Sequence, residues 1–430
     1  MKRYSEYKDS GVKWIGEIPG HWKMPKLNRV VSKVGSGSTP RGGSEVYIDE
    51  GIKFLRSQNI HFEGLNLDSV VYIPDSINEQ MKNTQVQPFD VLLNITGGSI
   101  GRCFYVDDTL GKANVNQHVC IIRPLSVNYR FLKYFLQSNS GQSQVWFYQK
   151  GDREGLSAES IKTFRLPLPP LPEQQAIVTY LDTKVAKIDE YISIAEKKIA
   201  ALEELKQTII AEAVTRGIHK DVPMKDSGVK WIGMIPEHWK IRKMKFVFKE
   251  RSEKGYPNEP VLSATQSNGV IPQSMYENRV VVVNKGFENL KLVCKGDFVI
   301  SLRSFQGGIE YAYYRGIISA AYTILTKSAE FLNEGYVKNL FKSHPFVQLL
   351  KTCVTGIREG QNINYSLLRD KYIPVPPLAE QQEIVTYIEA KVANINQLCQ
   401  AERSQIEKLK EYKQRLISDV VTGKVKVTND

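Results

Sequence analysis

The sequence predicts a mixed α/β protein in which two similar globular halves are joined by two long helices, paired as an antiparallel coiled coil. Two observations predict this fold. The chain repeats its own motifs, and a long helical pattern follows the second motif of each repeat. Internal repeats that fill a chain set its architecture. With 430 residues, the chain is also long enough for two or three domains that each bury a core.

The repeat opens each half with a nearly identical segment. Residues 9–16 read Asp-Ser-Gly-Val-Lys-Trp-Ile-Gly, and residues 226–233 read the same. Both copies continue through Ile-Pro to a His-Trp pair, which ends at Trp22 and at Trp239. Matches of this length do not arise by chance, so the chain contains two copies of one plan.

A second motif closes each half and begins a long helix. Residues 169–175 read Pro-Pro-Leu-Pro-Glu-Gln-Gln, and residues 376–382 read Pro-Pro-Leu-Ala-Glu-Gln-Gln, 207 residues later. After each motif, apolar residues recur at alternating steps of three and four, which is the heptad seam of a coiled coil. The seam residues that we expect to hold the helices together and to support partner docking are Leu181, Ile188, Ile199, Leu202, Ile388, Ile395, Ile406 and Leu409.

The motifs and the helix signals divide the chain into four parts. Proline-rich segments precede the helices, and Gly217 and Gly423 follow them, as is usual at helix ends. Each helix of about 43 residues would be roughly 60–65 Å long, and such a seam needs a partner helix. The parts are a first globular half, a first long helix, a second globular half and a second long helix, at residues 1–170, 171–217, 218–375 and 376–425.

One seam position is lysine in both helices, at Lys206 and Lys413. One interpretation is that these side chains flank the interface and reach into solvent. The other is that they fix the register of the two helices, as polar seam residues do in coiled coils. Glu402 interrupts the second seam and is open to the same two interpretations.

The globular halves contain short β-rich runs and few helical patterns. Strands are expected at residues 52–55, 70–73, 91–93, 119–122, 280–283 and 298–300, and short helices at 129–137 and 335–342. Asp90 aligns with Asp297 and Gly101 with Gly308, but the loops between them differ completely. Either the two halves bind different sequences, or they have diverged after duplication without consequence for function.

The charge predicts a polyanionic partner. The chain has 58 Lys and Arg against 46 Asp and Glu, a net charge of +12. Residues 173–215 carry −3 and residues 380–422 carry −1, which leaves +16 on the rest of the chain. Such an excess attracts nucleic acid. Duplex DNA would therefore dock on the globular halves and their flanks.

Polar loop residues are the candidates for DNA contact. Arginine suits guanine and phosphate, and asparagine and glutamine suit adenine edges in the major groove. The candidates in the first half are Arg56, Gln58, Asn59, Arg102, Asn116, Gln117, Lys150 and Arg153. Those in the second half are Thr265, Gln266, Arg303, Gln306, Arg358, Gln361 and Asn362.

The sequence has no convincing catalytic motif. It has no phosphate-binding loop for ATP and no Asn/Asp-Pro-Pro-aromatic run of the kind that holds a flipped adenine. The six histidines are scattered singly and the five cysteines lie far apart, so we expect no metal site and no disulfide framework. With no signal peptide and no long apolar run, we expect a cytoplasmic protein without a membrane span.

The two motif pairs together resemble the specificity subunits of Type I restriction–modification systems. The resemblance rests on Trp-Ile-Gly through His-Trp, then Arg-Glu-Gly, then Glu-Gln-Gln opening a helix, each found twice. It implies that each half is a target-recognition domain that reads one part of a split, asymmetric sequence in double-stranded DNA. It also implies that the helices set the spacing and dock two modification (methyltransferase) subunits, with motor–nuclease subunits as further partners of the complex. The subunit itself would carry no catalytic centre and no cofactor, since the methyl donor and ATP would bind its partners.

Three alternatives remain open at this point. The chain could be a self-contained DNA methyltransferase or nuclease with an unrecognised site, which methyl transfer by the chain alone would reveal. It could be a coiled-coil adaptor that binds only protein, which salt-sensitive DNA binding would exclude. It could also be the recognition subunit of a related system that cuts on both sides of its site.

Overall fold

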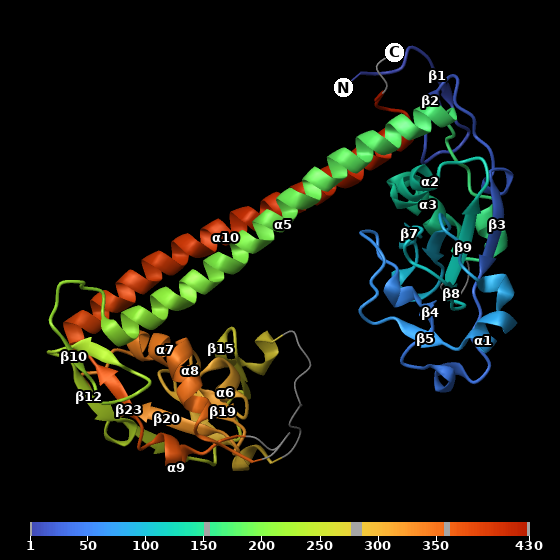
Figure 1. Ribbon diagram of the computed structural model, residues 1–430. Helices are drawn as coiled ribbons and strands as arrows, with labels where there is room; N and C mark the ends of the chain where they lie inside the picture. The colour runs from blue at the N-terminus through green and yellow to red at the C-terminus, as the bar shows by residue number, and fades with distance from the viewer. Residues whose placement is uncertain (1, 150–154, 277–285, 357–361, 428–430) are drawn as a thin grey trace. The chain divides into compact units, whose positions relative to one another are not determined.

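The structure is a computed structural model that describes residues 2–149, 155–276, 286–356 and 362–427. The chain forms two compact units, which we call unit 1 and unit 2. Unit 1 contains Met1–Ala195 and Ser404–Asp430, and unit 2 contains Glu196–Arg403. Each unit therefore holds one globular half together with one end of the helix pair (Figure 1).

Unit 1 is built around a four-stranded antiparallel sheet. Its strand order is β3 (Val31–Ser36), β9 (Val119–Pro124), β6 (Val91–Asn94) and β7 (Cys103–Tyr105). A second sheet has the order β5 (Val71–Ile73), β4 (Ile52–Leu55) and β8 (Ala113–Val115), and β1 (Tyr7–Asp9) pairs with β2 (Glu17–Pro19). The short helices are α1 (Asp75–Gln80), α2 (Tyr129–Gln137), α3 (Asn139–Tyr148) and α4 (Ala158–Lys162).

Unit 2 has a four-stranded sheet of the same kind. Its order is β13 (Phe248–Arg251), β20 (Thr323–Lys327), β17 (Phe298–Ile300) and β18 (Glu310–Tyr311). The paired strands around it are β10 (Met224–Asp226) with β11 (Met234–Pro236), β12 (Lys240–Lys243) with β23 (Tyr372–Val375), β14 (Leu262–Thr265) with β15 (Gly269–Pro272), β16 (Lys291–Val293) with β19 (Gly316–Ile318), and β21 (Val354–Thr355) with β22 (Asn362–Ile363). The short helices are α6 (Ser304–Gly307), α7 (Glu334–Lys342), α8 (His344–Lys351) and α9 (Tyr365–Leu368).

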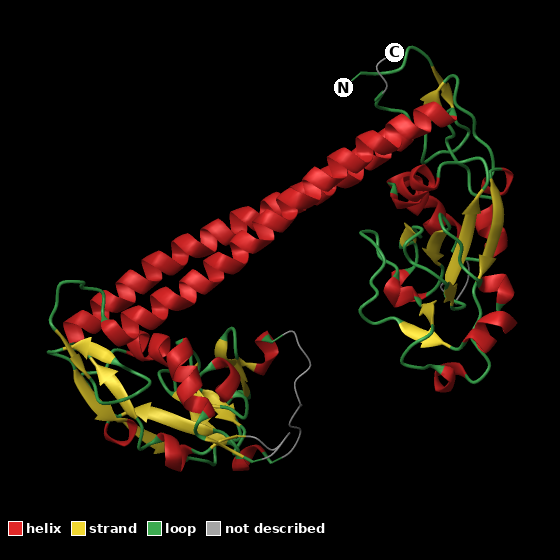
Figure 2. Cartoon of the chain, in the orientation of Figure 1, coloured by secondary structure: helices red, strands yellow, loops and turns green. Residues whose placement is uncertain are grey.

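The sequence repeat is also a structural repeat. In unit 1 Val91 pairs with Ile122, and in unit 2 the matching Phe298 pairs with Leu325. The expected mixed α/β fold with two repeated halves is confirmed, and Figure 2 shows strands and short helices mixed in both. The expected strands and helices are present as β4, β5, β6, β9, β17, α2 and α7, with bounds that differ by no more than one residue at most ends. The strand expected at 280–283 lies outside the described residues.

The amphipathic helix after the four-stranded sheet organises the core of each unit. In α2, Phe131, Leu132, Phe135 and Leu136 are at most 1% exposed, and the helix packs against β6 and β7. In unit 2, α7 contributes its apolar residues to the core around Trp239 in the same way. Spacings of three and four place such side chains on one helix face, so one face of α2 and of α7 is available for packing.

Two long helices run antiparallel. They are α5 (Leu171–Arg216) and α10 (Leu378–Val421). In unit 1 the start of α5 lies beside the end of α10, and in unit 2 the end of α5 lies beside the start of α10 (Figure 1). Gly217 and Gly423, with φ of 80° and 74°, follow the helix ends in the left-handed region that stops a helix at low cost. The expected helix pair is therefore present.

The expected seam residues lie on the buried side of the two helices. Leu181, Ile188, Ile388, Ile395 and Ile406 are at most 6% exposed. The remaining three, which are Ile199, Leu202 and Leu409, are half-buried. Burial of this apolar stripe stabilises the pair, at about 25 cal/mol per Å² removed from water.

The seam lysines bond across the helix pair at equivalent positions. In unit 1, Lys413 Nζ donates to Asp189 Oδ1 at 2.7 Å. In unit 2, Lys206 Nζ donates to Asn396 Oδ1 at 3.2 Å, and Asn396 is the residue that matches Asp189 in the repeat. The half-buried Glu402 bonds Lys198 of the other helix. These contacts favour the interpretation in which polar seam residues fix the register.

The five cysteines carry free thiols, of which four are buried. Within the described ranges, no helix combines the length and apolarity that crossing a membrane requires.

Candidate nucleic-acid interface

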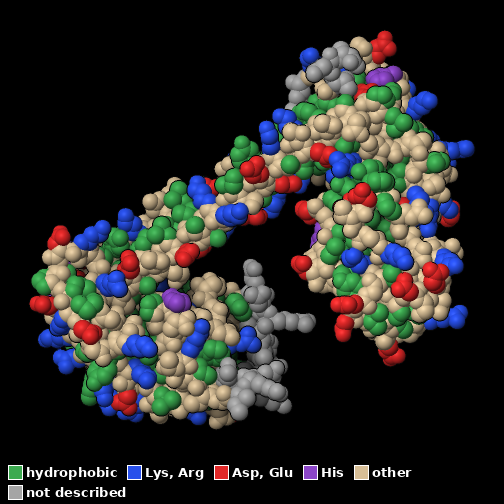
Figure 3. All heavy atoms as spheres, in the orientation of Figure 1, with side chains coloured by type: hydrophobic (Ala, Val, Ile, Leu, Met, Phe, Trp, Pro, Cys, Tyr) green, Lys and Arg blue, Asp and Glu red, His purple; other side chains and the backbone are tan. Residues whose placement is uncertain are grey.

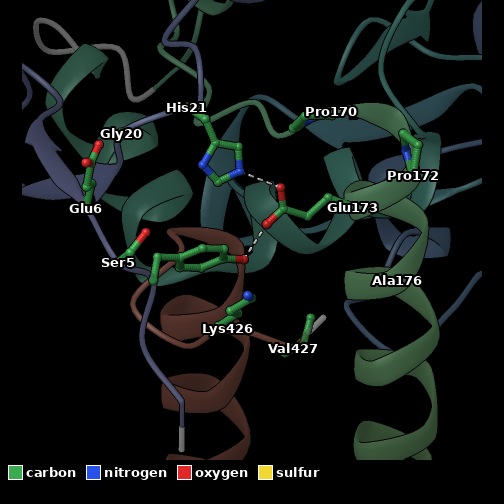
Figure 4. Close-up of a pocket in the computed structure, with 11 residues that line it drawn as sticks. Ser5, Glu6, Gly20, His21, Pro170, Pro172, Glu173, Ala176, Lys426 and Val427 are labelled. Atoms are coloured by element: carbon green, nitrogen blue, oxygen red, sulfur yellow. Dashed lines mark hydrogen bonds and ion pairs between the residues drawn. The ribbon is translucent and has the colours of Figure 1, made fainter. Parts of the chain in front are cut away.

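The two motifs of each repeat meet in space, where they anchor the globular half to its long helix. In unit 1 the imidazole Nε2 of His21 lies 2.9 Å from Glu173 Oε2, and the hydroxyl of Tyr4 donates to the other carboxylate oxygen (Figure 4). In unit 2 His238 Nε2 lies 2.7 Å from Glu380 Oε2, and the indole of the next residue donates to Oε1 at 3.0 Å. The glutamate of Glu-Gln-Gln is therefore an anchor for the His-Trp segment.

The first glutamine of the same motif is buried and joins three segments. Gln174 is 1% exposed, and its Nε2 donates to the carbonyl of Pro169 at 2.8 Å. Its Oε1 accepts from the backbone N–H of Asn128, the N-cap of α2, also at 2.8 Å. Gln381 makes the matching two bonds in unit 2, each at 2.8 Å. A buried amide that satisfies partners on both sides fixes α2 and α7 relative to the long helices.

In unit 1, loops from both sheets leave the strands at one edge. Asn94, the last residue of β6, donates from Nδ2 to the carbonyl of Ser57 at 2.7 Å and lies 3.2 Å from Ser99 Oγ. A Cβ on Gly37 would lie 2.2 Å from the carbonyl oxygen of Val115, so the segment after β3 also reaches this edge. We call it loop edge 1, and it consists of residues 37–39, 56–59, 95–102 and 116–118.

Three of the expected contact residues lie together in the loop after β4, with different exposures. Asn59 is fully buried, and its amide bonds the carbonyl of Asn66 at 2.8 Å and the N–H of Arg56 at 2.9 Å. The guanidinium of Arg56 donates to the carbonyl of Ser69 at 3.0 Å. Gln58 is exposed. Asn59 and Arg56 therefore shape this loop, and Gln58 presents its amide to solvent.

Arg102, Asn116 and Gln117 lie on the other loops of this edge. Arg102 is half-exposed, and within the described ranges its guanidinium has no hydrogen-bond partner. Asn116 is 9% exposed and accepts the N–H of His118 at 3.2 Å, which closes the turn before β9. Gln117 is exposed at the tip of that turn. The guanidinium of Arg102 and the amide of Gln117 are thus both accessible to solvent on loop edge 1.

A polar chain that the sequence analysis missed crosses the same edge. Thr39 donates to Gln117 Oε1 at 2.5 Å, Gln117 Nε2 lies 3.0 Å from His118 Nε2, and His118 Nδ1 lies 2.6 Å from Thr96 Oγ1. These residues come from three separate segments. A lone histidine and two lone threonines carry no local pattern, so only the fold brings them together.

In unit 2 the matching edge is formed by the β14–β15 hairpin and the loop after β17. Thr265 is 4% exposed, and its hydroxyl donates to the carbonyl of Gly269 at 2.9 Å, which closes the hairpin. Gln266, Arg303 and Gln306 are exposed. We call residues 265–269 and 301–307 loop edge 2.

Lys342, the last residue of α7, was not among the expected site residues and joins the two segments of loop edge 2. Its ammonium donates to the carbonyl of Gln266 at 3.2 Å, to the carbonyl of Gly307 at 3.0 Å and to Glu310 Oε1 at 2.6 Å. Glu310 is 2% exposed, and burial raises the pKa of its carboxyl group, although the lysine opposes this shift. The hairpin and the loop are thus held as one surface.

The remaining expected contact residues are described only in part. Lys150, Arg153, Arg358 and Gln361 lie outside the described residues. Asn362 is exposed on β22. The chain re-enters the described part of unit 1 at Gly155, which bridges to Thr96 of loop edge 1.

The two globular halves differ in net charge, and the second half is the more positive. Residues 1–170 have 21 Lys and Arg and 16 Asp and Glu, whereas residues 218–375 have 23 and 14. Figure 3 shows Lys and Arg side chains spread over unit 2, and Asp and Glu side chains at the end of unit 1 that carries β5 and α1. Across the described ranges, no group of three or more His, Cys, Asp or Glu side chains is arranged to hold a metal ion.

These features define a class of protein. Two modules of one fold each present polar loops at the same sheet edge, carry a positive charge, and are anchored to paired helices. Modules with one scaffold and different loop residues suit a protein that binds two different segments of a polyanion.

The comparisons with known proteins agree on one family. The family model of the Type I restriction modification DNA specificity domain matches residues 19–204 and 236–408. The Type I restriction enzyme EcoKI specificity subunit of Escherichia coli (strain K12) is 20% identical over 445 residues, with 95% of this chain and 90% of that protein covered. The chain therefore belongs to the specificity subunits of Type I restriction–modification systems, and its two globular halves are DNA-recognition domains without a catalytic role.

Solved structures share the fold. A chain from a structural study of complex assembly and conformational transition of the type I R-M system aligns with a TM-score of 0.69 at 17% identity, covering 95% of this chain and 99% of that chain. The HsdS subunit from Thermoanaerobacter tengcongensis aligns with a TM-score of 0.52 at 18% identity, covering 95% and 98%.

Proposed function

We propose that the two recognition domains read the two different parts of an asymmetric, split DNA sequence. The observation that carries the proposal is that loop edges 1 and 2 occupy the same edge of one scaffold and present different side chains. At one matching position, unit 1 has Thr96, bonded to a histidine, and unit 2 has the exposed Arg303. Different donor and acceptor patterns select different base edges in the major groove.

The exposures narrow the set of residues that we propose to contact DNA. Gln58, Arg102 and Gln117 would contact the first half-site, and Gln266, Arg303 and Gln306 the second, because their side chains face solvent. Asn59 and Thr265 would instead shape the loops, since their side chains are buried and bonded within them. Asn362 is a further candidate from its exposure alone.

We also propose that the helix pair docks two modification (methyltransferase) subunits. Each unit exposes one large apolar side chain from each helix within a turn of its lysine contact. Unit 1 exposes Tyr191 and Tyr412 by 61% and 42%, and unit 2 exposes Leu398 and Leu205 by 43% and 47%. These are matching positions of the repeat. Two equivalent apolar patches, one in each unit, suit two copies of one partner.

In this assembly the seam residues would hold the helices together and the exposed patches would hold the partners. The methyl donor would bind the modification subunits, and ATP would bind motor–nuclease subunits if these join the complex. The specificity subunit would act in the cytoplasm, where it meets chromosomal DNA.

Methylome sequencing tests the split site. A host that expresses this chain with its modification subunit should methylate one motif with two specified parts of different sequence, separated by a fixed unread gap. A palindromic motif, or methylation by this chain without a modification subunit, would contradict the proposal. Cleavage on both sides of the site would assign the chain to a related system.

Matched aspartate variants test the docking sites. Y191D/Y412D and L205D/L398D place charge in one patch each, and each should reduce the complex from two modification subunits to one in native mass spectrometry. The control variants S193D and Q400D occupy matching exposed positions about half a turn away and should leave two subunits bound. Full assembly of both patch variants would rule out these surfaces.

A heptad insertion tests the helices as a ruler. Seven residues added to α5 after Ala195, with seven added to α10 after Arg403, preserve the seam and lengthen the pair by about 10 Å. The unread gap should grow by about three base pairs, at roughly 3.4 Å each, with both specified parts unchanged. An unchanged gap would show that the helices do not set the spacing.

A further inference from the structure

In each recognition domain, the last residue of one short helix bonds to segments of the loop edge or beside it. That residue is an amide in unit 1 and a lysine in unit 2. Gln137 and Lys342 are the last residues of α2 and α7, and a serine follows each of them. Gln137 is 7% exposed, and its Nε2 donates to the carbonyls of Phe62 at 2.7 Å and Cys103 at 3.0 Å. Gln137 thereby joins the segment after residues 56–59 to β7. In the same way, Lys342 joins the tip of the β14–β15 hairpin to the loop before β18.

The bonds of Lys342 exclude a simple role as a phosphate contact. An ammonium group has three N–H donors, and the three acceptors named above use all of them. Although 29% of its side chain is exposed, no donor remains for a DNA phosphate. Two of the acceptors, the carbonyls of Gln266 and Gly307, instead belong to the segments that carry Gln266, Arg303 and Gln306, and the third is Glu310 of β18.

The neighbouring glycines show how closely these segments approach. A Cβ on Gly308 would lie 2.3 Å from the carbonyl oxygen of Phe341, the residue before Lys342. A Cβ on Gly307 would lie 3.0 Å from Cδ of Gln266, so the hairpin tip is in direct contact with the loop. The bridge between Val270 and Ala312 holds the base of the hairpin to the chain after the loop, whereas at the tip Lys342 adds hydrogen bonds to this van der Waals contact.

From this geometry we propose that Lys342, with Glu310, is a positioning residue for sequence reading by unit 2. It holds Gln266 and the Arg303 loop as one rigid DNA-facing surface, and Gln137 does the equivalent in unit 1 with a neutral amide. The inference rests on the proposed function, because it assigns Gln266 and Arg303 to the second half-site. It adds that discrimination depends on a residue that touches no DNA.

The test is the variant K342Q in the full chain with its modification subunit. We expect discrimination at the second half-site to fall about tenfold, since a displaced reader loses roughly one good base contact. Discrimination at the first half-site should be unchanged. The slope of log affinity against log salt should also be unchanged, because no phosphate contact is lost.

Three further variants make the test decisive. K338Q removes an exposed lysine four residues earlier on α7 and should leave both half-sites at wild-type discrimination. Q137A should relax the first half-site and not the second. E310M/K342M removes the buried ion pair as a unit, which proteins tolerate better than a single buried charge, and it should relax the second half-site if K342Q does not fold.

Each outcome discriminates between explanations. A lower salt slope and uniformly weaker binding would show that Lys342 contacts phosphate, which overturns the inference. Folded variants with wild-type discrimination at the second half-site would overturn it as well and leave the split-site proposal intact. A wild-type chain with no bipartite methylated motif would overturn the proposed function itself.

Discussion

The two sheets keep one buried aspartate and hold it with an arginine from a different strand in each unit. Asp90 is fully buried and accepts two bonds of 2.8 Å from Arg123 of the neighbouring strand β9. Asp297, at the matching position, accepts one bond of 3.0 Å from Arg251 of the edge strand β13. The position of the acid is fixed by the turn before the strand, where it accepts a backbone N–H at 2.7 Å in both units.

The different arginine partners of Asp90 and Asp297 indicate which parts of the repeated sheet can change and which cannot. An acid that satisfies backbone N–H groups in a tight turn is hard to replace, because its loss leaves buried donors unpaired. The arginine that pairs with the acid needs only to lie within bonding distance, and either β9 or β13 can carry it. The scaffold is therefore preserved at the acid, while residues around it are free to change.

The middle of α2 and the middle of α7 differ in a similar way. Lys133 is 6% exposed, and its ammonium lies 3.3 Å from the ring centroid of Tyr134. Lys338, at the matching position, is exposed and lies 5.1 Å from the ring of Tyr313. One position of the repeat thus carries a buried cation in unit 1 and a solvated cation in unit 2.

The largest expected effect separates the two aspartates. D90A leaves Arg123 without its carboxylate in a buried site, and we expect unit 1 to lose about 3–5 kcal/mol. D297A should cost less, because Arg251 keeps an ion pair of 2.7 Å with Glu253. Hydrogen exchange of the full chain, measured for the amides of each unit, gives both values. Equal losses of stability in the two variants would show that the ion pair between Arg251 and Glu253 does not compensate for the missing aspartate.

A pH dependence distinguishes the two lysines. Burial lowers the pKa of Lys133 from 10.5 to about 8. Between these pH values the unfolded state binds more protons than the folded state, so the stability of unit 1 rises with pH, by at most about 3 kcal/mol. Urea unfolding at pH 7.5 and 10.5 should show a smaller rise in K133M than in wild type, and no such change in K338M. Identical pH profiles for all three would contradict burial of Lys133.

Removing a reader arginine should affect one half-site at a time. R303A should cost about 1–3 kcal/mol of discrimination at the second half-site, and R102A a similar amount at the first. Binding to DNA libraries randomised in one half-site measures both. Relaxation of both half-sites by either variant would mean that the two recognition domains do not read independently.

The smallest expected effect compares the two seam lysines. K413M removes a lysine that bonds both oxygens of Asp189, and we expect a loss of about 0.5–1 kcal/mol for this half-exposed pair. K206M removes a bond to the neutral amide of Asn396 and an ion pair of 2.7 Å with Glu203 of its own helix. It should cost less, because an ion pair three residues apart on a helix contributes only about 0.2–0.5 kcal/mol. Thermal unfolding of each variant at low and high salt provides the comparison, since the K413M difference should shrink more with salt than the K206M difference. A larger effect of K206M would show that Lys206, and not Lys413, contributes more to the stability of the helix pair.

Sequence reasoning brings the candidate residues to the two loop edges but does not predict which of them are exposed. Asn59 and Thr265 are candidates because amides and hydroxyls suit base edges, yet both are buried and bonded within their own loops. Gln58, Arg102, Gln266 and Arg303, which are also candidates from their residue type, have exposed or half-exposed side chains. Residue type predicts what a group can bond, but neighbours distant in sequence decide whether that group faces water.

The sequence by itself determined the repeat, the two long helices and their antiparallel seam. These features depend on periodicity and on end signals such as Gly217 and Gly423, and both are local properties of the chain. It also determined the positive charge of the globular halves, which is additive over residues.

Only the tertiary structure decided how each loop edge is assembled. Lys342 reaches Gln266, which lies 76 residues earlier, and Gln137 reaches Phe62, 75 residues earlier. No pattern in the sequence marks either residue, because a single hydrogen-bonding side chain acquires its role from the segments that folding places around it. The order of the four strands in each sheet has the same origin, since pairing between distant strands follows from the packing of the whole domain.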